Sequence, residues 1–113
     1  VYKRQVSLVV ADLAFISIVK VLPAIAAILP PGGEAVVLVK PQFEVGPDKV
    51  GSGGVVRDPD DRAAAIAAVR AAAGGLGFTV VGGVDAPVAG ARSGNVEHFL
   101  HLRRGSTPGG VLS

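Results

Sequence analysis

The spacing of apolar residues predicts alternating strands and helices in the first part of the chain. Val6–Ala11 is a short, β-branched apolar run, typical of a strand in a parallel sheet covered on both faces. Ser17–Leu29 has apolar residues at helical spacing, with Ser17 as a candidate N-cap. Pro23 fits that helix only in its first turn or at a kink. After the helix-breaking stretch "PPGG", Glu34–Lys40 predicts a second strand that ends on a lysine.

The remaining pattern predicts a loop, a helix and two further strands. Pro41–Arg57 contains too many Gly and Pro residues for a regular element, and we interpret it as a long loop that forms a lid. Asp58–Gly75 is the clearest helix, with Asp58 as its cap and two Gly residues at its end. Phe78–Val84 and Glu97–Arg103 are the predicted third and fourth strands.

This order of elements predicts an α/β fold. Strands that alternate with helices favour a parallel sheet with right-handed crossovers. The connection over residues 85–96 is too short and too rich in Gly and Pro for a crossover helix, so we expect the last strand to be antiparallel. A mostly parallel sheet with one antiparallel strand near its C-terminal edge is typical of the class I (Rossmann-like) methyltransferase fold. We expect a partial version of it, with N-terminal strands missing.

The composition indicates a partial domain. The chain has 113 residues, enough for one small domain, and contains neither Met nor Cys. A chain without Met lacks an ordinary start, so we expect a fragment. The absence of Cys fits a cytoplasmic protein, whereas the net charge of +2 says little about partners. The longest apolar run, Leu13–Pro31, carries Lys20 and Pro23, which argues against a membrane span.

The two ends of the chain are expected to lie outside the folded unit. Val1–Gln5, "VYKRQ", back-translates as GTG TAT AAG AGA CAG, part of a common transposase adapter used in sequencing libraries. We therefore set residues 1–5 aside as a non-native scar, the alternative being an ordinary basic lead-in to the strand. Residues 6–104 form the predicted domain, and residues 105–113 are expected to be a disordered tail.

Three charged residues are expected to meet at one edge of the sheet. Ligands of open α/β sheets bind beyond the carboxyl ends of the strands. Asp12 follows the first strand, Lys40 ends the second, and Glu97 begins the antiparallel last strand. Their convergence makes them candidate catalytic residues. Each also has a structural interpretation: Asp12 as a helix cap, Lys40 as a solvated strand end, and Glu97 as a surface residue of an edge strand.

Other polar residues are weaker candidates. His98 and His101 would point to opposite faces of a strand, which is poor geometry for a shared metal, so we expect no metal site. Ser17 has no evident His partner for nucleophilic catalysis. Arg57 is a candidate contact to phosphate. The stretch "GSGG" lacks the Lys-Ser/Thr ending of a phosphate loop.

Four motifs stand in order along the chain: "LVVADLAFISIVKVLPA", "LVKPQFEVG", "VGSGGVVRDP" and "SGNVEHFLHLRR". Together they closely resemble the C-terminal half of the TlyA family, whose members are often labelled haemolysins and are similar to FtsJ-type ribose methyltransferases. The match spans Val6–Arg104. The chain departs from the family pattern at Ser7, where an acidic residue is usual, and at Ala14, where Ser is usual.

The resemblance implies methylation of a cytidine 2′-hydroxyl in ribosomal RNA, with S-adenosylmethionine as the methyl donor. FtsJ-type enzymes use a Lys-Asp-Lys-Glu tetrad, of which Asp12 matches the Asp, Lys40 the second Lys and Glu97 the Glu. We further expect Asp12 and Leu13 to contact the cofactor, and Lys40 and Arg57 to contact the RNA. The first Lys and the glycine-rich cofactor loop have no counterpart in this chain, so we expect the chain by itself to be inactive.

Two other functions stay open. A pore-forming haemolysin, suggested by the family label, would need a membrane span or a strongly basic amphipathic helix, and the sequence predicts neither. A non-catalytic half-domain would use the exposed edge of its first strand to bind another chain or to aggregate. Under the methyltransferase interpretation we expect a ribosomal subunit as the partner and no membrane, and the sequence gives no signal for an oligomeric state.

Overall fold

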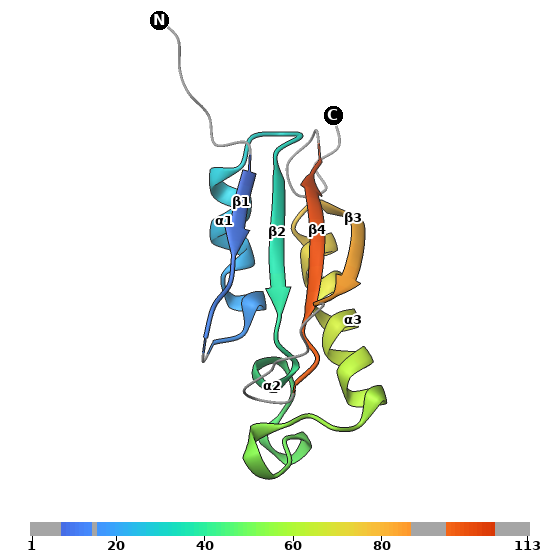
Figure 1. The fold of residues 1–113 in the computed structure, drawn as a ribbon. Helices are drawn as coiled ribbons and strands as arrows, with labels where there is room; N and C mark the ends of the chain where they lie inside the picture. The colour runs from blue at the N-terminus through green and yellow to red at the C-terminus, as the bar shows by residue number, and fades with distance from the viewer. Residues whose placement is uncertain (1–7, 15, 87–94, 106–113) are drawn as a thin grey trace, which may run out of the picture.

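The structure, a computed structural model, describes residues 8–14, 16–86 and 95–105. Its strands form one sheet in the order β1-β2-β4-β3 (Figure 1). They are β1 (Leu8–Ala11), β2 (Glu34–Val39), β3 (Phe78–Asp85) and β4 (His98–Arg104). β1 and β2 are parallel, whereas β4 is antiparallel to both β2 and β3. The predicted mixed sheet is confirmed, and its antiparallel strand lies between β2 and β3.

The predicted helix Ser17–Leu29 is divided into two pieces. Ser17 Oγ accepts a hydrogen bond from the Val19 amide at 3.1 Å and caps the 3₁₀ turn η1 (Ile18–Lys20). Helix α1 (Leu22–Ile28) follows, with Pro23 in its first turn. Proline has no N–H to donate to a preceding turn, so a new helix begins around it.

Helix α3 (Pro59–Gly75) begins and ends as its sequence predicts. Asp58 Oδ1 accepts a hydrogen bond from the Asp60 amide at 2.8 Å, and acidic residues occupy the first turn. Beyond the helix, Gly77 has a φ of 89°, a left-handed conformation that favours glycine. The chain then enters β3 directly.

The prediction that Pro41–Arg57 contains no regular element is wrong. The segment holds helix α2 (Pro41–Glu44) and the 3₁₀ turns η2 (Pro47–Lys49) and η3 (Ser52–Gly54). Both α2 and η2 have a proline in their first turn. At that position the fixed φ of proline suits a helix and its missing N–H is not needed. Proline therefore starts helical turns here, where the composition alone indicated a loop.

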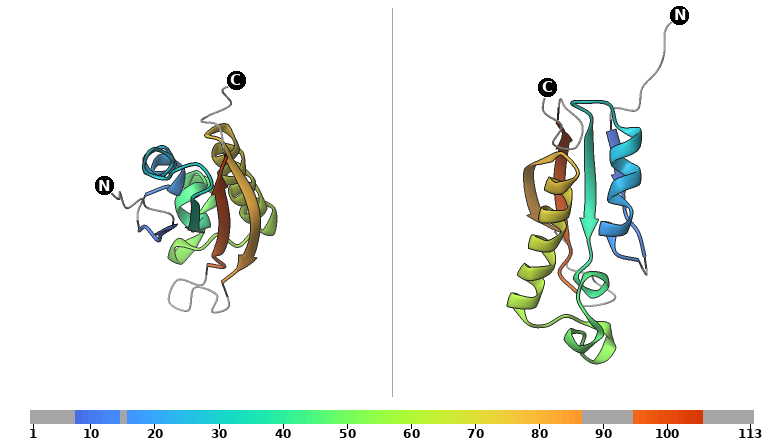
Figure 2. Two further views of the ribbon diagram at one scale, coloured as in Figure 1. Left: turned by 90° about the horizontal axis from the view of Figure 1, so that it is seen from above. Right: turned by 180° about the vertical axis from the view of Figure 1, so that it is seen from behind.

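The helices α1 and α3 cover the same face of the sheet, as the view from behind shows (Figure 2). The buried core between them and the strands consists of Ile18, Leu22, Ile25, Ala26, Leu29, Ala35, Val37, Val39, Val69, Ala73, Phe78, Leu100 and Leu102. On the other face, Leu8, Val10 and Val84 are each more than half exposed. Among the described residues β1 is therefore covered on one face, and not on both as its sequence predicts.

Several predictions concern residues outside the described part of the chain. These are the scar at residues 1–5, most of the connection over residues 85–96, and the tail from residue 106 onward. Gly105, the first residue of the predicted tail, is described, and its amide donates a hydrogen bond to the Gly77 carbonyl at 2.8 Å. This bond continues the pairing of β3 with β4 by one residue.

Candidate active site

Asp12 and Lys40 meet at one rim of the sheet. Lys40 Nζ lies 2.7 Å from Asp12 Oδ1. The two residues directly follow β1 and β2, and because these strands are parallel neighbours their carboxyl ends lie side by side. The Lys40 side chain is 17% exposed and that of Asp12 is 61% exposed, so a sheltered cation pairs with a carboxylate open to solvent. Ser17, and not Asp12, caps the following helical turn.

Glu97 lies at the same rim of the sheet, directly before β4. The antiparallel pairing of β2 with β4 sets Val39 opposite His98. Lys40 directly follows Val39, and Glu97 directly precedes His98, so both residues come next to this last paired position of the sheet. The Glu97 carbonyl also accepts a hydrogen bond from the Ala86 amide at 2.8 Å. All three candidate catalytic residues therefore come from strand ends at the same rim.

The other two predicted contact residues are Leu13 and Arg57. Leu13, next to Asp12, is half-buried and packs against the core. Arg57 is exposed, and its Nη2 donates a hydrogen bond to the Ser52 carbonyl at 3.1 Å. The guanidinium thus folds back over its own loop. The roles of Leu13 toward the cofactor and of Arg57 toward RNA stay predictions.

A carboxylate that the sequence analysis did not single out joins the same two segments. Glu44, the last residue of α2, accepts a hydrogen bond from Ser17 Oγ at 2.5 Å through Oε1. Its Oε2 accepts a second one from the Ile18 amide at 2.7 Å. The signal was present in the motif "KPQFE", which contains Glu44, but the partner on the other segment depends on the tertiary fold.

A buried amide holds the glycine-rich loop in place. Asn95 is 1% exposed, its Oδ1 accepts a hydrogen bond from the Val56 amide at 2.8 Å, and its Nδ2 donates one to the Gly54 carbonyl at 2.9 Å. Gly53 and Gly54 have φ values of 78° and 74°, which favour glycine. The segment predicted to be a lid is therefore tied at its base to the chain just before β4.

An ion-pair cluster fixes the start of β4 from the helix side. Asp85 contacts both His98, at 2.8 Å from Nδ1, and the Arg62 guanidinium. Arg62 Nε also donates a hydrogen bond to the Val96 carbonyl at 3.0 Å. The hydrogen bond from His98, with a contribution from Arg62, lowers the pKa of Asp85 below its ordinary value of 3.8. These contacts hold the residues on both sides of Glu97.

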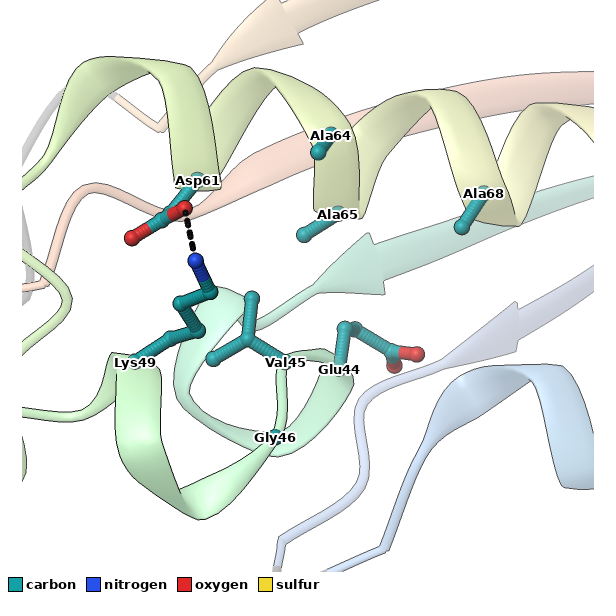
Figure 3. A pocket seen from close by; sticks show the side chains of 8 residues that line it. All are labelled: Glu44, Val45, Gly46, Lys49, Asp61, Ala64, Ala65 and Ala68. Carbon is teal, nitrogen blue, oxygen red and sulfur yellow. Dashed lines mark ion pairs between the residues drawn. The ribbon is translucent and has the colours of Figure 1, made fainter.

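A cavity of about 230 Å³ lies between α2 and α3 (Figure 3). It is lined by Glu44, Val45, Gly46, Lys49, Asp61, Ala64, Ala65 and Ala68. In this lining Lys49 Nζ lies 3.6 Å from Asp61 Oδ1, and the Glu44 carboxylate points away from that pair. Neither Asp12 nor Lys40 lines the cavity, so it is separate from the candidate active site.

Residues 1–104 match the profile of one protein family, described as FtsJ-like methyltransferase. The chain belongs to the FtsJ-like methyltransferase family. The resemblance predicted from the four motifs is thereby confirmed. The matched range includes residues 1–5, whose origin as a non-native scar stays a prediction.

Two relatives of this FtsJ-like chain carry names that refer to ribosomal RNA. The 16S/23S rRNA (cytidine-2′-O)-methyltransferase TlyA of Mycobacterium tuberculosis is 52% identical over 99 residues, which make up 88% of this chain and 37% of that protein. YqxC of Bacillus subtilis, described as a candidate rRNA methyltransferase, is 38% identical over 91 residues, 80% of this chain and 32% of its own length. The chain thus spans about a third of the curated relatives it matches.

A solved structure has the same fold as this FtsJ-like chain. The structure, described as that of a candidate hemolysin from Streptococcus thermophilus, superposes with a TM-score of 0.84 at 40% identity. The match covers 90% of this chain and 36% of the other. Within residues 8–14, 16–86 and 95–105, no helix has both the length and the apolar character needed to cross a membrane.

Proposed function

We propose that this chain is the C-terminal part of the catalytic domain of an S-adenosylmethionine-dependent enzyme that methylates a cytidine 2′-hydroxyl in ribosomal RNA. The observation that carries the proposal is the Asp12–Lys40 ion pair at the carboxyl rim of β1 and β2. The identity of 52% to TlyA, whose name states this activity, supports the choice of substrate. The activity itself belongs to the longer protein.

Lys40 has the surroundings of a residue that orients a hydroxyl. A ribose hydroxyl is a poor nucleophile, so alignment with the methyl group supplies much of the rate. A sheltered ammonium beside the 2′-oxygen also stabilises the negative charge that develops there as the proton leaves. Asp12 holds the Lys40 side chain from one side, and Glu97 directly precedes His98, which pairs with Val39 next to Lys40. We assign these three residues the catalytic positions.

The residues after β1 fit one wall of a cofactor site. S-adenosylmethionine, when bound, supplies the methyl group from a positively charged sulfonium. The exposed carboxylate of Asp12 complements such a cation, and the half-buried Leu13 offers an adjoining apolar contact. We therefore propose Asp12 and Leu13 as cofactor contacts. The glycine-rich loop and the first Lys of the tetrad would come from another part of the protein, so the chain alone is expected to be inactive.

The RNA is proposed to reach the rim over the segment Gly51–Arg57. Arg57 is exposed at the end of this segment, and Lys40 lies at the rim of the sheet. Arginine binds phosphate oxygens through paired N–H groups. Since ribosomal subunits are the proposed partner, we propose a cytoplasmic location.

The test uses the full-length protein that carries this sequence. Purified protein is incubated with each ribosomal subunit and S-adenosylmethionine labelled in its methyl group, and the labelled nucleoside is identified after digestion. We expect 2′-O-methylcytidine, and none with Lys40→Met or with the 113-residue chain alone. No methyl transfer to either subunit would refute the proposal. Methyl transfer by the 113-residue chain alone would refute the expectation that its active site is incomplete. Dye release from liposomes by the same preparation would instead favour the haemolysin interpretation.

A further inference from the structure

Two contacts join the segment after β1 to the segment after β2. One is the Asp12–Lys40 ion pair, at 2.7 Å. The other is made by Glu44, whose two carboxylate oxygens accept hydrogen bonds from Ser17 Oγ and from the Ile18 amide. The segments of residues 12–18 and 40–44 are therefore connected at both ends. Lys40 and Glu44, which make the two contacts, belong to the same motif, "KPQFE".

The two contacts differ in how firmly they hold. An ion pair whose carboxylate is 61% exposed contributes little net stability, because water competes for the charge and both side chains lose freedom. The Glu44 contacts are part-buried and charge-assisted, and such bonds are about twice as strong as neutral ones. Glu44 also places a negative charge at the start of η1, where the backbone N–H groups point outward. The glutamate contact is the firmer of the two.

The glutamate is linked rigidly to Lys40. Helix α2 is a single turn with Lys40 as its N-cap and Glu44 as its last residue. The Phe43 amide donates to the Lys40 carbonyl at 2.9 Å, and the Val45 amide donates to the Pro41 carbonyl at 3.1 Å. Pro41 is fully buried and fixes φ at the start of the turn. Anchoring Glu44 therefore also anchors the backbone of Lys40.

We propose that Glu44 is a positioning residue, which sets the distance between Lys40 and Asp12 by holding α2 against the Ser17–Ile18 turn. The inference rests on the proposed function, since it concerns the geometry of the same rim. Glu44 itself touches neither reacting group. Substitution of Glu44 keeps the side chains of Lys40 and Asp12 unchanged, but it lets the segment after β1 and the segment after β2 move apart.

The test compares Glu44→Gln and Glu44→Ala with Asp48→Asn in the full-length protein, using methyl transfer to ribosomal RNA. Asp48 is an exposed carboxylate of the neighbouring turn and serves as the matched control. A misplacement of about 1 Å costs about 10²-fold in rate, so we expect kcat of Glu44→Ala to fall about 10²-fold. We expect a smaller fall for Glu44→Gln, because an amide has one accepting oxygen. KM for both substrates should stay within about twofold, and Asp48→Asn should match the wild type.

A double variant separates positioning from general destabilisation. Ser17→Ala removes one partner of Glu44, so Ser17→Ala combined with Glu44→Gln should be no slower than the slower single variant. Equal kcat values for folded Glu44→Gln and wild type would overturn the inference, as would a rise in KM with kcat unchanged. If Glu44→Ala does not fold, the nearly isosteric Glu44→Gln decides. If the wild-type protein shows no methyl transfer, the proposed function is refuted. If the wild type is active and Glu44→Gln has the same kcat, only the role of Glu44 is refuted.

Discussion

Asp85 and His98 face each other across the β3–β4 pair, with His98 Nδ1 2.8 Å from Asp85 Oδ1. Arg62 from α3 contacts the same carboxylate oxygen. One carboxylate thus joins the helix to two strands at the end of the sheet where the candidate active site lies. It does so without being part of that site.

This cluster should make stability depend on pH through Asp85. Its folded-state pKa is lowered, first by the His98 hydrogen bond, so its contribution is present above 3.8 and is lost as pH falls through the lowered value. Asp85→Asn should therefore lower the Tm at neutral pH, and the difference from wild type should vanish in strong acid. Thermal unfolding followed by circular dichroism measures this. Asp48→Asn is the control, and a pH-independent difference would contradict the linkage.

Gly83 should not tolerate a side chain. A Cβ at Gly83 would lie 2.6 Å from His98 Nε2, 3.0 Å from Leu100 Cδ2 and 3.2 Å from the Phe99 carbonyl oxygen. We expect Gly83→Ala to cost about 1–3 kcal/mol of unfolding free energy, because neighbours in a packed sheet must shift. Gly82→Ala is the matched control, since nothing lies within 4 Å of its Cβ. Urea titration of both variants tests the difference, and equal midpoints would refute it.

Asn95 should hold the glycine-rich loop. Asn95→Ala leaves the Val56 amide and the Gly54 carbonyl without the partners that this side chain supplies. Such a loss costs about 1–3 kcal/mol. We expect faster hydrogen exchange at Val56 in the variant, measured by NMR or mass spectrometry, and unchanged exchange in Ser52→Ala, whose side chain is exposed. Protection of Val56 equal to wild type would show that the loop is held by other contacts.

Lys40 should matter for activity far more than for stability. In the full-length protein Lys40→Met should lower kcat by at least about 10²-fold, since it removes the cation proposed to face the 2′-oxygen. Its effect on unfolding should stay within about 1 kcal/mol, because the partner carboxylate of Asp12 is 61% exposed. Lys49→Met, at an exposed lysine paired with Asp61, is the control. A loss of stability that matches the loss of activity would argue for a structural role.

The sequence predicts the Asp12–Lys40 pair for a topological reason. Both residues directly follow apolar runs, and the ends of adjacent parallel strands share a rim whatever the intervening chain does. The contact of Glu44 with Ser17 and Ile18 has no such local basis. It depends on α2, whose Gly- and Pro-rich surroundings indicate a loop by composition, although a proline in the first turn favours a helix.

The same contrast applies at Asn95. A lone Asn beside Gly and Ser residues reads as part of an exposed turn, because polar residues are mostly exposed. Its burial follows from the glycine-rich loop, which folds back more than 35 residues away in sequence and presents a main-chain donor and acceptor to it. A side chain that forms hydrogen bonds with backbone groups of a distant segment leaves no periodic pattern in the sequence.

The strand order also fixes when the domain can be completed during synthesis. Among the described residues β4 is the last strand in sequence, yet it lies between β2 and β3 and pairs with both. During synthesis β3, with its apolar residue Phe78, therefore leaves the ribosome before β4, the strand that it pairs with among the described residues. The fully buried core residues Leu100 and Leu102 belong to β4 and are therefore also synthesised after β3. A nascent chain stopped before His98 would leave exposed the edges of β2 and β3 that pair with β4, and such edges favour aggregation.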